Sequence, residues 1–146
     1  MSLPAYPFRQ ITAPVRRMSL PTRVLIIDDD RETTDLFKVI LEPNDFDVLV
    51  ANSGQEGVRL ARSMQPDVLV VDMLMPDMDG LAVCQEVRRF SNAPILMLTA
   101  FGKPSVMEQA LDEGADDYLI KPLSNTLFIA SLNKLARRAR LNQKVN

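Results

Sequence analysis

Five short, mostly apolar runs alternate with amphipathic segments along the chain. They occupy residues 24–27, 46–51, 68–71, 94–98 and 118–120. Short apolar runs rich in Val and Ile are typical of strands that are buried on both faces of a parallel sheet. Each run is followed by a segment with helical spacing, which predicts five βα units. We therefore expect an α/β fold with a doubly wound, five-stranded parallel sheet in the flavodoxin-like order 2-1-3-4-5 and helices on both faces.

The segments between these runs carry helix start and stop signals. Pro43 stops the first helix, and Ser53 is expected to cap the second, which ends before Pro66. Pro104 lies in the first turn of the fourth helix, and Gly114 ends it. The helices are expected at about 31–42, 53–65, 81–90, 104–113 and 124–141.

The first twenty residues differ from the rest of the chain. They show no apolar periodicity, and the Met-Ser-Leu-Pro at 1–4 recurs at 18–21. We interpret residues 1–20 as a disordered leader or added segment and exclude them from the fold. Residues 21–142 are expected to form one domain, and residues 143–146 a tail.

Composition narrows the possible chemistry. The 146 residues, 47% hydrophobic and 25% charged, suit one domain with an ordinary core. The single cysteine, Cys84, allows no disulfide within the chain and is expected to be a small buried residue. Because no apolar stretch reaches the roughly 18 residues of a membrane span, we interpret the protein as soluble and cytoplasmic. Histidine is absent, which excludes histidine-based catalysis and most transition-metal sites.

Charge is distributed unevenly, although the net charge is only −2. All 19 acidic residues lie within 24–117, whereas residues 118–146 carry six Lys and Arg and no acid. An acidic body favours cation binding, and basic ends suit acidic partners or nucleic acid. For the C-terminal segment we favour a solvated helix face, without direct nucleic-acid binding by this domain.

Polar residues stand where the predicted strands end. Asp28 and Asp29 follow the first run, Asp72 the third, Thr99 the fourth and Lys121 the fifth. Ligands of open parallel sheets bind outside the carboxyl ends of the strands, so these groups are expected to converge. Together they suit a hard divalent cation and phosphoryl oxygens. Taken singly, each has an ordinary alternative as a turn, cap, strand-end or surface residue.

Four motifs, in order, resemble the receiver domain of bacterial two-component response regulators, the CheY-like family. The resemblance covers residues 23–140, about four fifths of the chain. It implies a phospho-accepting switch, rather than an enzyme, that assists its own Mg²⁺-dependent phosphorylation and dephosphorylation. The donor would be a histidine kinase or a phosphotransfer protein. The motifs are Val24–Asp30, Val71–Gly80, Leu98–Ala100 and Gly114–Pro122.

The resemblance also implies roles for the acidic residues. Asp72 would be the phosphoacceptor, since a carboxylate can accept a phosphoryl group as an acyl phosphate. Asp29 and Asp72 would ligate Mg²⁺ directly, and Asp28 would hold it through water. The backbone carbonyl of Leu74 would supply a further oxygen.

Other residues would contact the phosphoryl group and transmit its presence. By resemblance, Thr99 and Ala100 contact that group, and Lys121 pairs first with Asp72 and then with the phosphoryl oxygens. The aromatic ring of Tyr118 would turn inward when Thr99 moves. The surface formed by 104–113, 118–120 and 124–141 would then switch and bind a downstream effector domain or protein.

Three further expectations concern the surroundings of the site. Leu74 and Phe101 would exclude the hydrolytic water and lengthen the lifetime of phospho-Asp72, where fast-hydrolysing relatives carry polar groups. The alternative is that both side chains point into solvent as ordinary loop residues. Asp77 and Asp79 are expected to organise the loop rather than bind metal. Asp116 and Asp117 are expected to be surface or interface charges.

The switching surface departs from that of relatives that dimerise through charge pairs. Met107, Leu127 and Ser131 stand where those relatives carry charges. We therefore do not expect the charge-paired dimer, and an apolar homodimer contact through Leu127 is left open.

Two other functions are compatible with parts of the sequence. Asp28 and Asp30 form the Asp-x-Asp pair of phosphatases that use an aspartyl phosphate, although Glu32 is atypical and the chain lacks room for a substrate-covering cap. The other alternative is a receiver-like interaction module that is not phosphorylated. The sequence names neither the cognate kinase nor the output.

Overall fold

A computed structural model describes residues 20–100 and 102–145 of the chain. The segment expected to be a leader therefore lies, apart from Leu20, outside the described residues. Phe101, to which the sequence assigned a role in the lifetime of the phosphoryl group, lies outside them as well.

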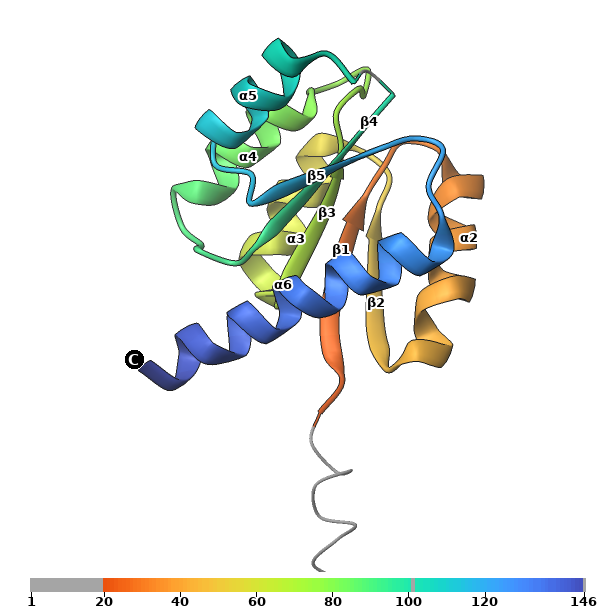
Figure 1. Ribbon diagram of the computed structural model, residues 1–146. Coiled ribbons are helices and arrows are strands. Elements are labelled where there is room, and N and C mark those ends of the chain that lie inside the picture. Colours follow the sequence, from red (N-terminus) through yellow and green to blue (C-terminus); the bar gives the residue numbers. More distant parts are fainter. Residues whose placement is uncertain (1–19, 101, 146) are drawn as a thin grey trace, which may run out of the picture.

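The described residues form a five-stranded, fully parallel sheet (Figure 1). The strand order β2-β1-β3-β4-β5 confirms the predicted topology. It makes β1 and β3 neighbours, and β5 is an edge strand. The strands are β1 (Thr22–Ile27), β2 (Phe46–Ala51), β3 (Val68–Asp72), β4 (Ile95–Thr99) and β5 (Asp117–Ile120).

Helices cover both faces of the sheet, as predicted (Figure 1). The sequence placed most of their ends within one or two residues. Pro43 does not follow the first helix directly but lies in a 3-10 turn, η2 (Glu42–Asn44), that extends it. The helices are α2 (Arg31–Leu41), α3 (Gly54–Met64), α4 (Gly80–Arg88), α5 (Pro104–Asp112) and α6 (Asn125–Val145).

Alternating side chains of the strands divide the core into two layers. In β1, Leu25 and Ile27 face the layer under α3, α4 and α5, and Val24 and Ile26 face the layer under α2 and α6. In the second layer the rings of Phe37 and Phe128 lie 4.7 Å apart between centroids, which joins α2 to α6. The sheet is thus buried on both sides, as its continuous apolar runs indicate.

Short polar side chains begin three of the helices. Asp30 caps α2 by accepting from the Glu32 amide, Ser53 caps α3, and Asp79 caps α4. The last helix runs to Val145, four residues beyond its predicted end, because residues 142–145 contain no Gly or Pro to stop it.

Cys84 is fully buried, as expected, and burial raises the pKa of its thiol to about 12. No helix in the described ranges is long and apolar enough to cross a membrane.

Asp116 is not a free surface charge, which corrects the expectation from the sequence. One of its carboxylate oxygens accepts from Arg88 at 2.9 Å and from the Ile95 amide at 2.8 Å, and the other accepts from Arg138 at 3.2 Å. Arg88 also donates to the Gly114 carbonyl. This carboxylate therefore joins α4, the start of β4 and α6 at the end of the sheet opposite to the carboxyl ends of the strands.

We predict that Asp116→Ala lowers the free energy of unfolding by about 1–3 kcal/mol, because the Ile95 amide loses its acceptor and Arg88 keeps only backbone carbonyls as acceptors. The matched control is Asp117→Ala, since among the described residues the carboxylate of Asp117 accepts only from the next amide along the chain, that of Tyr118. It should cost within about 0.5 kcal/mol. Urea denaturation of both variants measures the difference, and equal losses would contradict the role given to Asp116.

Candidate functional site

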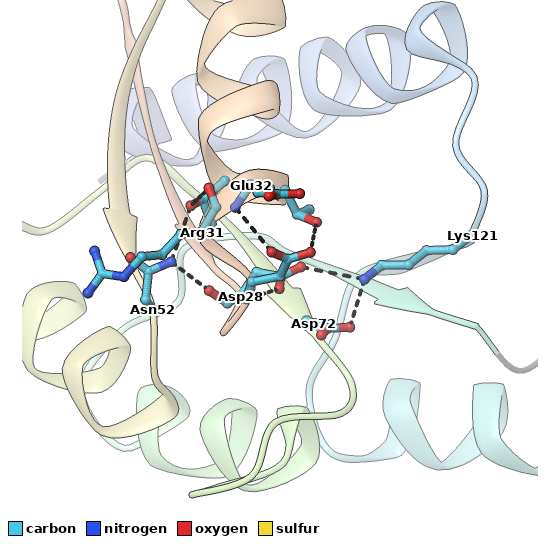
Figure 2. Close-up of polar contacts among 9 residues, drawn as sticks. Asp28, Arg31, Glu32, Asn52, Asp72 and Lys121 are labelled. Carbon is cyan, nitrogen blue, oxygen red and sulfur yellow. Dashed lines mark hydrogen bonds and ion pairs between the residues drawn. The ribbon is translucent and has the colours of Figure 1, made fainter.

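The carboxyl ends of β1, β3 and β5 bring three charged side chains together (Figure 2). Asp28 follows β1, Asp72 is the last residue of β3, and Lys121 follows β5. Carboxylate oxygens of Asp28, Asp29 and Asp72 all lie within 4.8 Å of one another. The predicted convergence at the sheet edge is confirmed.

Lys121 bridges two of these carboxylates. Its Nζ lies 3.2 Å from Asp72 Oδ1 and 3.4 Å from Asp28 Oδ2. The side chains of Asp28 and Asp72 are 3% and 11% exposed, whereas that of Lys121 is 30% exposed. The ammonium group thus approaches a largely buried pair of acids from the solvent side.

The charges shift the proton affinity of two groups. Burial, and then repulsion by Asp28, raises the pKa of Asp72, and the attraction of Lys121 only partly opposes this. Burial lowers the pKa of Lys121, but the attraction of Asp28 and Asp72 outweighs it, so that this pKa is raised. One ammonium group contacts the three-carboxylate cluster in the described part of the chain, which leaves excess negative charge there. Clustered carboxylate oxygens of this kind fit a hard divalent cation such as Mg²⁺.

Asp28 has a structural role besides its place in the cluster. Its Oδ1 accepts from the Asp30 amide at 2.9 Å, while its Oδ2 faces Lys121. Its backbone carbonyl accepts from Asn52 Nδ2 at 2.9 Å. The interpretation of Asp28 as a turn residue and its interpretation as a site residue are therefore compatible.

Sequence reasoning missed Asn52. Its side chain also donates to Thr34 Oγ1 at 3.2 Å, so it links the ends of β1 and β2 to the first turn of α2 (Figure 2). The signal was available, because Asn52 directly follows β2 as Asp28 follows β1. The strand-end residues selected from the sequence lie at the other four strands, and none lies at the end of β2.

The loop after β3, residues 73–79, borders the site and is fixed at several points. The carboxylate of Asp77 accepts from the amides of Gly54 and Gln55, each at 3.0 Å, and Asp79 accepts from Ala82 at 2.8 Å. Both acids thus organise the loop, as expected. Leu74 lies two residues after Asp72, and its side chain is largely exposed.

The remaining predicted residues lie along β4 and β5. Thr99 is the last residue of β4 and is buried, whereas Ala100 is exposed. The Lys121 amide donates to the Thr99 carbonyl at 2.8 Å, which sets Lys121 beside the end of β4. Tyr118 is half-buried in β5 and packs against the layer under α3, α4 and α5. The Lys121–Pro122 peptide bond is cis.

Comparison with known proteins identifies similar sequences and folds. The family model for the response regulator receiver domain matches residues 24–133. The chain is 43% identical over 119 residues to the DNA-binding dual master transcriptional regulator RpaA of Synechocystis sp. (strain ATCC 27184 / PCC 6803 / Kazusa), covering 80% of this chain and 49% of that protein. It is 40% identical over 120 residues to the response regulator MprA of Mycolicibacterium vanbaalenii, covering 82% and 52%. The chain thus spans about half the length of the curated relatives it matches.

Solved structures resemble it over nearly their whole length. The receiver domain of the Francisella response regulator 1452 superposes with a TM-score of 0.76 at 34% identity, covering 81% of this chain and 98% of that one. A two-component response regulator from Clostridium difficile superposes with a TM-score of 0.77 at 30% identity, covering 80% and 97%.

The raised pKa of Asp72 predicts how stability depends on pH without metal. Below the ordinary value of 3.8 the carboxyl is protonated in both the folded and the unfolded chain. As the pH rises, the unfolded chain ionises first, so stability is lost until the raised pKa of the folded state is passed. Each pKa unit of difference corresponds to about 1.4 kcal/mol.

We therefore expect Asp72→Asn to be more stable than the parent at pH 7 in EDTA, with a gain that shrinks as the pH falls toward 3.8. Urea denaturation from pH 3.5 to 8 measures this gain. A variant that is less stable than the parent at neutral pH would mean that the Lys121 contact outweighs the repulsion.

Proposed function

The chain belongs to the response regulator receiver domain family, and on that premise we propose that Asp72 accepts a phosphoryl group from a histidine kinase or phosphotransfer protein. The observation that carries this proposal is the position of Asp72. It ends the central strand β3 within a cluster of carboxylates and is contacted by Lys121. It is still partly exposed, so a donor can reach it.

We propose that Asp28, Asp29 and Asp72, with the backbone carbonyl of Leu74, hold Mg²⁺. The support is their clustering and their chemistry, since Mg²⁺ prefers oxygen ligands and commonly joins one or two carboxylates to phosphate oxygens. A bound cation of this kind neutralises the charge that builds up on the phosphoryl oxygens during transfer.

In the transfer step one bond forms and one bond breaks. A carboxylate oxygen of Asp72 attacks phosphorus, the bond from phosphorus to the donor's imidazole nitrogen breaks, and the imidazole leaves with the electron pair. Lys121 already lies beside Asp72 and can turn its ammonium group from the carboxylate to the incoming phosphoryl oxygens. Thr99 and Ala100, at the end of the neighbouring strand β4, complete the contacts with that group.

We propose that the surface of α5, β5 and α6 transmits the change. Phosphorylation adds about −1.5 to −2 charges at Asp72, which would draw the Thr99 hydroxyl inward and let Tyr118 follow. Four large apolar side chains are exposed on these elements, Leu111, Ile120, Leu127 and Leu141. They suit an effector domain, an effector protein or a second copy of the chain.

The contacts of the described residues weigh against the charge-paired dimer and against the phosphatase alternative. Ser131 is buried, so a charge at its position would not reach a partner. Asp30, the second acid of the Asp-x-Asp pair, accepts from the Glu32 amide and from the Thr33 hydroxyl. The Thr33 contact holds the pKa of Asp30 below its usual range, which makes this carboxyl a poor proton donor to a leaving group.

Incubation with Mg²⁺ and a small acyl phosphate or phosphoramidate should add one phosphoryl group per chain. Asp72→Asn should abolish the labelling, because no carboxylate then ends β3. The matched control is Asp47→Asn, which removes a carboxylate that is paired with Arg23 in another part of the molecule. Intact-mass spectrometry reports the added mass, and undiminished labelling of Asp72→Asn would refute the assignment.

The lifetime of phospho-Asp72 should depend on Leu74. We expect Leu74→Asn to lose the phosphoryl group faster, by up to about tenfold or about 1.4 kcal/mol in the barrier, because an amide can orient the attacking water. Leu74→Ala removes the large apolar side chain without adding a polar group. Comparing the two variants therefore separates the exclusion of water from its orientation. If Leu74→Asn loses the phosphoryl group no faster than the parent, this side chain does not set the lifetime.

A further inference from the structure

A carboxylate at the apex of the loop 73–79 connects that loop to another helix. Asp77 Oδ1 accepts from the Gly54 amide and Oδ2 from the Gln55 amide, each at 3.0 Å, so both oxygens are used at the start of α3. These amides hold the pKa of the Asp77 carboxyl below its usual range. The carboxylate is therefore ionised at the positive end of a helix dipole, where negative charge is favourable.

The ends of the same loop are held as well. The Gly80 amide donates to the Met73 carbonyl at 2.8 Å, which closes the loop at its base. At the apex, the backbone of Gly54 lies so close to Met78 that a Cβ atom on residue 54 would come within 2.8 Å of Met78 Cβ. The loop thus packs directly against the first residue of α3, and Asp77 provides the polar part of this contact.

The start of α3 is itself tied to the site. Two residues before Gly54, Asn52 donates to the carbonyl of Asp28 and to Thr34 Oγ1. A continuous series of contacts therefore runs from the loop after β3, through Asp77 and residues 52–55, to Asp28. It joins the segments that follow three neighbouring strands of the sheet, β2, β1 and β3.

We propose that Asp77 is a positioning residue, which holds the loop 73–79 and with it the Leu74 carbonyl, the backbone ligand proposed above for the site of Asp28, Asp29 and Asp72. This inference rests on the proposed function, because it concerns the same metal and phosphoryl site. Releasing Asp77 frees the loop apex while Asp72 remains within β3. The carboxylates keep their places, and the carbonyl ligand loses its fixed position.

The same two hydrogen bonds would be present if Asp77 did no more than cap α3. A variant of Ser53, which also caps α3, is the matched control for this alternative. Ser53 Oγ accepts from the Glu56 amide at 3.1 Å, so Ser53→Ala also removes a side-chain cap from α3. It does not release the loop after β3. The two variants therefore separate the stability of α3 from the position of the loop.

The experiment titrates Mg²⁺ alone into the full chain by NMR and measures thermal unfolding and amide exchange in EDTA. We expect Asp77→Ala to bind Mg²⁺ about tenfold more weakly and to speed exchange of the amides in 73–79. Ser53→Ala should bind Mg²⁺ as the parent does despite a similar loss of thermal stability. Asp77→Asn, which keeps one acceptor oxygen, should fall between Asp77→Ala and the parent. Asp29→Ala gives the loss expected when a direct ligand is removed.

If the parent chain binds Mg²⁺, either of two results would overturn the inference. One is an unchanged Mg²⁺ affinity in Asp77→Ala, and the other is an equal loss of Mg²⁺ affinity in Ser53→Ala. A parent chain that does not bind Mg²⁺ would instead refute the metal site itself, and the positioning role with it.

Discussion

Like-charge repulsion at the carboxyl end of the sheet is the constraint on which the site depends. A parallel sheet brings the ends of its strands to one edge, and this chain has acids at two neighbouring ends, after β1 and in β3. Carboxylates this close, with two of them largely buried, are stable only with compensating positive charge. Lys121 supplies part of it from the end of β5. The remaining negative charge is the physical basis of the proposed cation site.

The other end of the molecule shows the opposite balance. There Asp116 is shared by two arginines, Arg88 and Arg138, and by a backbone amide. A carboxylate with two cationic partners has its charge balanced and has a structural role, whereas Asp28 and Asp72 share the single ammonium group of Lys121. The same type of side chain therefore has a structural role at one end of the sheet and, in the proposed function, accepts a phosphoryl group at the other.

The strand pattern predicted the topology and with it the convergence of Asp28, Asp29, Asp72 and Lys121, because in a parallel sheet the position of a strand-end residue follows from strand order. Contacts that depend on where a side chain points were beyond the pattern. Asp116 was expected at the surface, since its partners Arg88 and Arg138 are 28 and 22 residues away. The pattern likewise did not show that Asp77 reaches α3, 23 residues away in sequence at Gly54.

The pairing of Phe37 with Phe128 has a consequence for biosynthesis. One layer of the core includes side chains of β1 to β4 together with helix α2 and the last helix, α6. At translation rates of about 5–20 residues per second, roughly 5–20 s pass between the synthesis of Phe37 and that of Phe128, whose ring packs against it. During that interval the nascent chain can complete the layer under α3 and α4, but the side of β1 that faces α6 remains open. The layer that needs the last helix of the sequence is therefore the later of the two to be completed during synthesis.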